Sequence, residues 1–184
     1  FEKGKSGARE MIVIAVMAAF SVVGRLIFAP IPAFKPVTAI TIISGVALGP
    51  EAGFIVGSMT AVVSNMFYGQ GPWTPFQMFV WGFIGFLAGV IFRKSKKPNR
   101  IVLSIVGAFG GVLFSLLMDI WTTLSLDGEF LLSRYLVNVA SSLSFMAIYA
   151  VSNIVFLIIL AHPFLEKLNR IKTKYGIFGL LSNV

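Results

Sequence analysis

The side chains that could do chemistry are few, and they lie near the ends of long apolar segments. Asp119 is the one acid well inside such a segment, so no pair of buried carboxylates is present for acid–base catalysis or ion coupling. The single histidine, His162, and the lack of cysteine leave no cluster of metal ligands and no Ser–His pair. The phosphate-binding pattern GxxxxGK[ST] does not occur, so the chain cannot hydrolyse ATP alone. These absences predict a protein that is not an enzyme and that holds no metal or cofactor.

A second set of residues predicts binding instead of catalysis. Its members are polar or aromatic and gather at the outer ends of the apolar segments. Because an unpaired polar group is costly in hydrocarbon, such side chains usually face the bundle interior or a wet cavity. Aromatic walls with a few hydrogen-bonding groups suit a vitamin-sized ligand held mainly by shape. The candidate ligand-binding residues are Phe34, Lys35, Asn65, Trp73, Gln77, Trp81, Asp119, Trp121 and Asn138.

These residues also have structural explanations. Arg25, at the outer end of the first segment, could simply pair with Asp119. Asn65, Gln77 and Asn138 could form interhelical hydrogen bonds worth about 1 kcal/mol each. The glycine- and proline-rich loop at 68–75 could be a lid over a ligand, or a turn whose tryptophan anchors at the membrane interface. The clustering at one membrane face is what favours the ligand hypothesis.

The elements that position these residues follow from the composition. The 184 residues are 57% apolar and 12% charged, with a mean hydropathy of +0.91, which excludes a soluble globule. Breaks in the apolar pattern predict spans at 11–29, 37–49, 52–68, 75–92, 101–125 and 135–161. The predicted fold is an all-α membrane protein, a six-transmembrane-helix bundle that forms one integral membrane substrate-binding domain over residues 1–184. The 37–49 run is short for a full crossing, so 37–68 could instead be a re-entrant hairpin.

The net charge of +8 favours a membrane over a nucleic acid as the partner, because basic residues beside apolar spans usually fix topology. Counting them on alternate flanks puts every Lys and Arg inside except Arg25, Lys35 and Arg134. We therefore expect both termini in the cytoplasm and a multi-pass protein of the cell membrane. The run Arg93–Arg100 becomes an inner loop. The basic tail Pro163–Tyr175 would lie on the membrane, touch a partner, or be solvated.

Small residues recur at a spacing of four, which puts them on one helix face. Ala15 and Ala19 do so in the first segment, and glycines continue the spacing from Gly45 to Gly57 and again at Gly85 and Gly89. Such faces let helices approach closely, which makes internal packing the default explanation. Ala15 and Ala19 could instead face a partner subunit.

Two parts of the sequence resemble a known family, the substrate-binding S components of energy-coupling factor (ECF) vitamin transporters. One runs from Lys35 to Gly53 (KPVTAITIISGVALGPEAG) and on through SNMFYGQGPWTPFQ, which ends at Gln77, to Gly89. The other is the Ala-x-x-x-Ala pair of Ala15 and Ala19, which is similar to the family's docking motif for the coupling subunit.

The resemblance implies a prokaryotic membrane protein that captures a vitamin from outside. It also implies partners: a transmembrane coupling subunit, the T component, and two cytoplasmic ATPases that supply the energy. The segment GQGPWTPFQ is most similar to the cobalamin-specific type, so the expected ligand is cobalamin or a related corrinoid. The alternatives are an S component for another vitamin or a queuosine precursor, and a stand-alone small facilitator that needs no ATPase.

Overall fold

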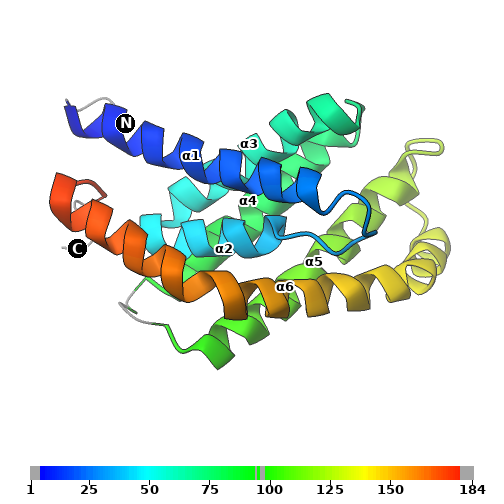
Figure 1. Cartoon of the computed structure of the whole chain (residues 1–184). Helices are drawn as coiled ribbons and strands as arrows, with labels where there is room; N and C mark the ends of the chain where they lie inside the picture. Colours follow the sequence, from blue (N-terminus) through cyan, green and yellow to red (C-terminus); the bar gives the residue numbers. More distant parts are fainter. Residues whose placement is uncertain (1–4, 94, 96–97, 179–184) are drawn as a thin grey trace.

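The computed structural model describes residues 5–93, 95 and 98–178. In these ranges the chain forms six helices and no strand (Figure 1). The helices are α1 (Lys5–Ile27), α2 (Val37–Leu48), α3 (Pro50–Tyr68), α4 (Thr74–Ile91), α5 (Arg100–Leu124) and α6 (Leu132–Tyr175). The predicted all-α fold is confirmed. Lys94, Lys96 and Lys97 of the expected inner loop lie outside the described residues.

The helices differ in their capacity to cross a bilayer. Within the described ranges, α1, α4, α5 and α6 are long and apolar enough to do so. Helix α2 has 12 residues, and at about 1.5 Å per residue it falls well short of the roughly 30 Å of hydrocarbon. The predicted span at 37–49 is therefore a helix that is too short to cross the hydrocarbon layer fully. Helix α6 is longer than the predicted span at 135–161, with 44 residues.

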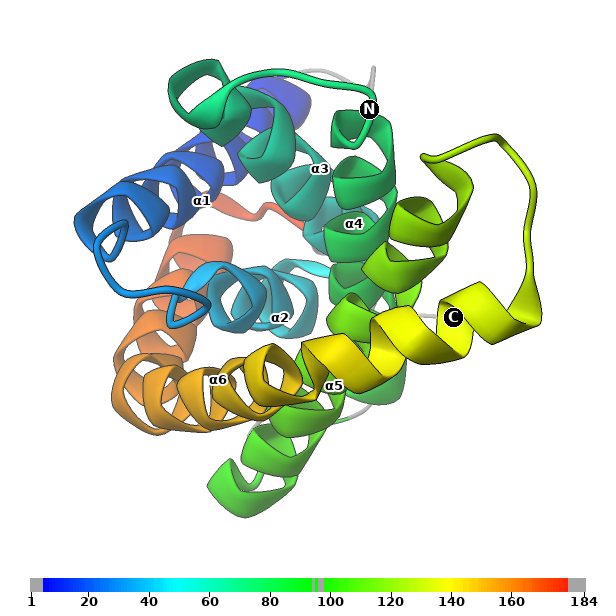
Figure 2. The same cartoon turned by 90° about the vertical axis from the view of Figure 1, so that its right-hand side faces the viewer.

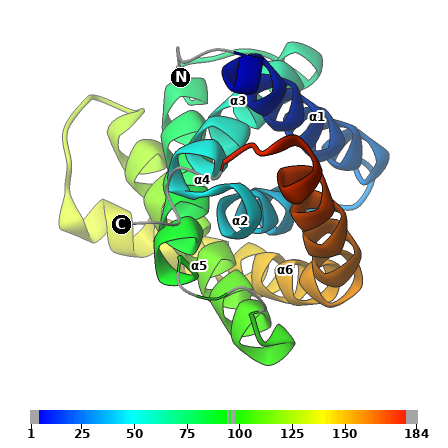
Figure 3. The same cartoon turned by 90° about the vertical axis from the view of Figure 1, so that its left-hand side faces the viewer.

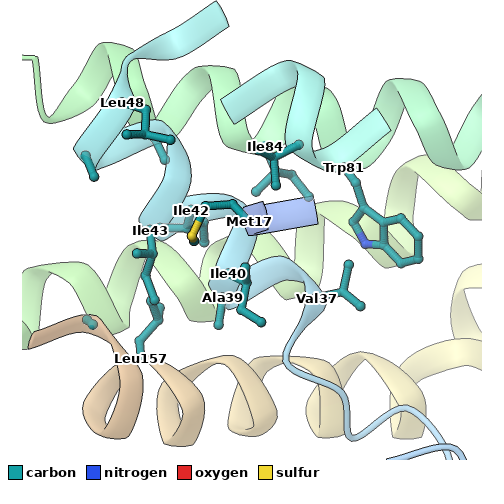
Figure 4. Packing of buried hydrophobic residues seen from close by; sticks show 14 of the residues in the cluster. Met17, Val37, Ala39, Ile40, Ile42, Ile43, Leu48, Trp81, Ile84 and Leu157 are labelled. Carbon is teal, nitrogen blue, oxygen red and sulfur yellow. The ribbon is translucent and has the colours of Figure 1, made fainter. Parts of the chain in front are cut away.

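Helix α2 is the centre of the bundle. Figures 2 and 3 show it surrounded by the other helices, and every residue of α2 except Val46 is buried. Ile42 and Ile43 are fully buried and belong to one apolar cluster with Ile84 of α4 and Leu157 of α6 (Figure 4). A helix that is apolar on all sides is stable only when it is enclosed, so α2 must be covered by the longer helices.

Glycines bring the backbones of α2, α3 and α4 into contact. A Cβ atom added to Gly53 would lie 2.6 Å from Gly45 Cα, and one added to Gly85 would lie 2.5 Å from the Gly53 carbonyl oxygen. Both positions leave no room for a side chain. Gly49 alone joins α2 to α3, with a φ of 107° that favours glycine. The repeated spacing thus serves internal packing, and the residues of this glycine seam are Gly45, Gly53, Gly57, Gly85 and Gly89.

The basic tail at 163–175 is a continuation of helix α6 and not a separate helix. Helix α6 continues through Pro163, and its last turns close against the ends of α1 and α2. The Lys172 ammonium donates a 2.7 Å hydrogen bond to the carbonyl oxygen of Ala47, near the C-terminal end of α2. The backbone N–H of Phe178 donates a 2.8 Å bond to Glu10 Oε1 of α1. The two ends of the described chain therefore lie at the same end of the bundle (Figure 1).

The glycine seam generates a stability prediction. We expect Gly85→Ala to destabilise the protein by about 1–3 kcal/mol, because the methyl group would overlap the Gly53 backbone. Gly110→Ala is the matched control, since its Cβ would meet side-chain methyl groups of Ile84, Ile42 and Thr38 at 3.3–3.4 Å. Thermal unfolding of both variants in detergent micelles checks this. Equal midpoints for the two variants would contradict the seam.

Candidate ligand-binding site

The site is built around a cation near the end of α1. Arg25 Nη1 donates hydrogen bonds to Ser64 Oγ and, at 2.8 Å, to Asn65 Oδ1, both on α3. The guanidinium carbon lies 4.6 Å from the ring centre of Tyr68 and 4.9 Å from that of Trp81. Hydrogen bonds and cation–π contacts offset part of the cost of removing the charge from water. Arg25 therefore ties α1 to α3 and α4.

Asn65 extends this contact into a network. Its side-chain Nδ2 donates to Thr74 Oγ1 at 2.9 Å and to Gln77 Oε1 at 2.8 Å, and the residue is 1% exposed. Its oxygen accepts from Arg25, so the buried amide uses both its donor and its acceptor groups. The network fixes where the first turn of α4 stands relative to α3, and with it the position of Gln77.

A small cavity of about 80 Å³ adjoins the network. One wall is aromatic: Trp81 stacks on Phe114 at 5.2 Å and 11°, and the ring of Tyr149 meets Phe114 edge-on at 5.2 Å. An aromatic wall with a few polar groups beside it suits a flat, partly polar ligand. The lining residues are Arg25, Ala33, Lys35, Val37, Thr38, Gln77, Trp81, Phe114, Tyr149 and Asn153.

The segment between α1 and α2 closes one side of the cavity. Phe34 lies in an aromatic group with Phe28 and Phe156, at ring distances of 6.0 Å and 5.1 Å. Ser152 Oγ on α6 donates a 3.1 Å hydrogen bond to the carbonyl oxygen of Lys35. These contacts hold the segment against α6 and keep the Lys35 side chain at the cavity.

Asp119 belongs to a separate polar cluster between α5 and α6. Its Oδ2 accepts a 2.6 Å hydrogen bond from Ser142 Oγ, and Asn138 Nδ2 donates to Thr123 Oγ1 at 3.0 Å. Asp119 and Arg25 form no ion pair in the part of the chain that the structure describes. The pairing suggested as a structural explanation for these two charges is therefore wrong, because each finds neutral partners on a nearer helix.

The structure brings some of the candidate binding residues together and leaves others apart. Lys35, Gln77 and Trp81 line the cavity, and Asn65 lies behind them in the network. Phe34 is in the aromatic group beside the cavity. The remaining candidates lie outside the lining: Trp73 is 39% exposed on the 69–73 loop, Trp121 packs on Phe76 at 5.2 Å, and Asp119 and Asn138 belong to the α5–α6 cluster.

Seven lining residues were not among the candidates: Arg25, Ala33, Val37, Thr38, Phe114, Tyr149 and Asn153. A signal existed for Tyr149 and Asn153, because they are polar, mid-helix and four residues apart, which places them on one face of α6. No comparable signal marks Phe114 among the many phenylalanines of the chain.

Ala15 and Ala19 lie in an apolar groove between α1 and α3, and neither lines the cavity. Both are exposed, and the groove has a volume of about 520 Å³. Its walls include Ile55, Met59 and Val63 of α3. The absence of side-chain bulk at the two alanines is what opens this groove.

The described residues form a cavity and no metal centre. Within residues 5–93, 95 and 98–178, no group of three His, Asp or Glu side chains could hold a metal ion. Several helices of membrane-spanning length surround a short core helix and a cavity with a polar network at one end. These features define a helical, membrane-integral protein with a small cavity inside the bundle.

The comparisons with known proteins agree with this class. The family model of the S component of the ECF-type riboflavin transporter matches residues 5–170, so the chain belongs to this family. It is a family of transporter components and not of enzymes, and its members are integral to the membrane. The match confirms the ECF S component resemblance but does not support the cobalamin-specific type.

Individual proteins that are similar to this chain match over a shorter stretch than the family model does. A UPF0397 protein of Aliivibrio fischeri (strain MJ11) is 29% identical over 119 residues, which cover 57% of this chain and 64% of that protein. A UPF0397 protein of Vibrio atlanticus (strain LGP32) is 32% identical over 99 residues, 51% of this chain and 53% of that protein. The chain thus spans less than two thirds of the length of these relatives. No solved structure matches.

The network predicts that Asn65 is a structural requirement of the site. We expect Asn65→Leu, which keeps the volume, to lower the free energy of unfolding by about 1–3 kcal/mol, because Thr74, Gln77 and Arg25 each lose a partner. Thermal unfolding in detergent measures it. Asn169→Leu, at an exposed position of α6, is the control and should stay close to the unsubstituted protein. An equally small effect of both substitutions would show that the network contributes little.

Proposed function

We propose that this protein is the substrate-specificity subunit of an ECF-type importer, which captures a vitamin from outside for ATP-driven uptake by partner subunits. The family match to the S component of the riboflavin transporter supports this proposal. The observation that carries it is the cavity at the end of the bundle where Arg25, Asn65 and Gln77 form one hydrogen-bonded network. A small pocket with fixed polar groups fits capture of one ligand better than passage of many.

The orientation belongs to the same proposal. The cavity-side end of the bundle carries the loops at 28–36, 69–73 and 125–131, whereas both described chain ends lie at the other end. With the basic residues at the chain ends in the cytoplasm, the cavity opens to the outside. All of residues 1–184 would then act as one membrane domain in a prokaryotic cell membrane.

The ligand is a vitamin whose ring fits between aromatic walls. A flavin is the first candidate, because the matching family model is described for the riboflavin transporter. Cobalamin or a related corrinoid, favoured by the GQGPWTPFQ segment, is the alternative, together with another vitamin or a queuosine precursor. The cavity of about 80 Å³ must open for any of these, and it must open far more for a corrinoid. The space therefore favours a flavin-sized or smaller ring.

The binding residues follow from the cavity. We propose that Lys35, Gln77 and Trp81 contact the ligand, with Asn65 orienting Gln77 and Phe34 closing the side. A ligand that extends beyond the cavity toward the outside would reach the remaining candidate residues, which are Trp73, Asp119, Trp121 and Asn138.

The partners would be a transmembrane coupling subunit and two ATPases. The apolar groove at Ala15 and Ala19 supports a docking role, because a helix of the coupling subunit can approach α1 closely only where side chains are small. Helix packing without a hydrophobic drive depends on such close contact.

Identification of the ligand tests the proposal directly. We expect the purified protein to release a vitamin that mass spectrometry identifies, and to take it up into proteoliposomes with its partner subunits only when ATP is supplied inside. Uptake by the protein alone, without ATPases, would instead identify a small facilitator, and a chemically altered ligand would identify an enzyme.

The docking role has its own test. Ala15→Trp combined with Ala19→Trp should fill the groove and abolish ATP-driven uptake while ligand binding is retained. Ile12→Trp combined with Val16→Trp is the matched control, because both residues are exposed on α1 but do not line the groove. Unimpaired uptake by the alanine double variant would refute docking at this face.

A further inference from the structure

The cavity contains two cations and no acid. Arg25 and Lys35 both belong to its lining, and the other described lining residues are neutral. The ring centre of Tyr68 lies 4.6 Å from Arg25 Cζ and 5.7 Å from Lys35 Nζ, so both charges flank a single ring. Two like charges in a poorly solvated site repel each other, and neutral rings provide no opposite charge. An anion between the two cations would remove this repulsion.

Both cations have hydrogen-bond donors that could bind such an anion. Arg25 uses Nη1 for both its bonds, to Ser64 and Asn65. In the part of the chain that the structure describes, no acceptor is assigned to its other guanidinium nitrogens or to Lys35 Nζ. The ion pairs in that part join other residues, Arg134 with Asp127 and His162 with Glu166.

Asp119 does not neutralise the pair. It lies on α5 outside the cavity lining, and its carboxylate accepts a hydrogen bond from Ser142 of α6. Tyr149, on α6, contributes a neutral phenol to the lining. The groups that face the two cations are therefore neutral on every helix that packs against the cavity.

We propose that the ligand of this site is an anion: a small ring compound with a carboxylate or a phosphate, which Arg25 and Lys35 hold from two sides. This inference rests on the proposed function and names the substrate class of the same site. A guanidinium presents paired donors that match both acidic groups, and an ammonium adds a point charge. The cavity of about 80 Å³ suits the acidic group itself, with the ring against Trp81.

The electrostatics of Lys35 agree with this assignment. Burial lowers the pKa of the Lys35 ammonium below its ordinary value, and the charge of Arg25 lowers it further. A bound anion favours the charged form and raises this pKa again. Binding of the anion is therefore expected to draw a proton onto Lys35 wherever part of the lysine is deprotonated.

Matched pairs of ligands test the charge requirement. The probes are riboflavin 5′-phosphate with riboflavin, biotin with biotin amide, and nicotinate with nicotinamide, each measured by calorimetry on the purified full chain in nanodiscs. Within the pair whose ring fits, we expect the anionic member to bind at least about tenfold more tightly, because only it pairs with the two partly buried cations. The vitamin released from the purified protein should likewise carry a carboxylate or a phosphate.

Substitutions at Lys35 assign the preference to the cavity. Lys35→Gln should reduce the preference for the anion by about tenfold, and Lys35→Arg should keep it. Arg134→Gln removes a cation at the same end of the bundle but outside the lining, and it should leave the preference unchanged. A loss of preference in Arg134→Gln as large as in Lys35→Gln would overturn the assignment, because it would indicate general attraction by surface charge.

The pH dependence gives an independent readout. Affinity for the anionic probe should fall at a pH below 10.5, the ordinary pKa of lysine, because Lys35 loses its proton earlier than an exposed lysine does. Lys35→Arg should abolish this fall, since arginine stays charged. The neighbouring titratable groups, Arg25, Tyr68 and Tyr149, are the same in both proteins. An identical fall in both would overturn the role of Lys35.

The outcomes separate this inference from the proposed function. Tight binding and ATP-driven uptake of a neutral vitamin would overturn the anion inference and leave the S component function intact. Failure of every probe to bind, with no vitamin released from the purified protein, would overturn both.

Discussion

The structure depends on how a permanent positive charge is accommodated near the end of a membrane helix. Arg25 cannot lose its proton, so the fold must supply partners for it. Ser64 and Asn65 accept its hydrogen bonds, and the rings of Tyr68 and Trp81 flank the guanidinium. These partners come from α3 and α4. The contacts that fix the position of α1 therefore also form one side of the cavity.

That arrangement is possible because α2, α3 and α4 form a compact unit behind it. The glycine seam lets their backbones touch, and Gly49 turns the chain directly from α2 into α3. Close backbone packing in a bilayer replaces the hydrophobic drive that lipid cannot supply. As a consequence α2 has little exposed surface, and only Val46 is not buried. The cavity then forms where the seam ends, at the larger residues Trp81 and Thr38.

The sequence predicted the parts of this structure that depend on hydrophobicity and spacing. Six apolar segments became six helices in the described part of the chain, and the glycine spacing marked the seam. Three of the candidate residues, Lys35, Gln77 and Trp81, line the cavity, and they were noticed because polar and aromatic residues near span ends are conspicuous. The sequence could not predict which side chains pair between helices. Depth in the membrane grouped Asp119 with Arg25, but the rotation of each helix about its axis turns Asp119 toward Ser142 and Arg25 toward Asn65. Pro163 likewise suggested an end to α6, which packing against α1 and α2 overrides.

Helix α1 carries both of the surfaces that the proposed function requires. Ala19 lies in the apolar groove and Arg25 in the cavity, six residues further along the helix, which is about 9 Å at the usual rise. A helix is stiff over such a distance, so a partner that shifts or rotates α1 at the groove would also move the guanidinium relative to Ser64 and Asn65. The same hydrogen bonds that keep the cavity formed therefore resist displacement of α1. A ligand that binds Arg25 adds to that resistance, and a partner that moves α1 must overcome it, which links occupancy of the site to docking through one rigid element.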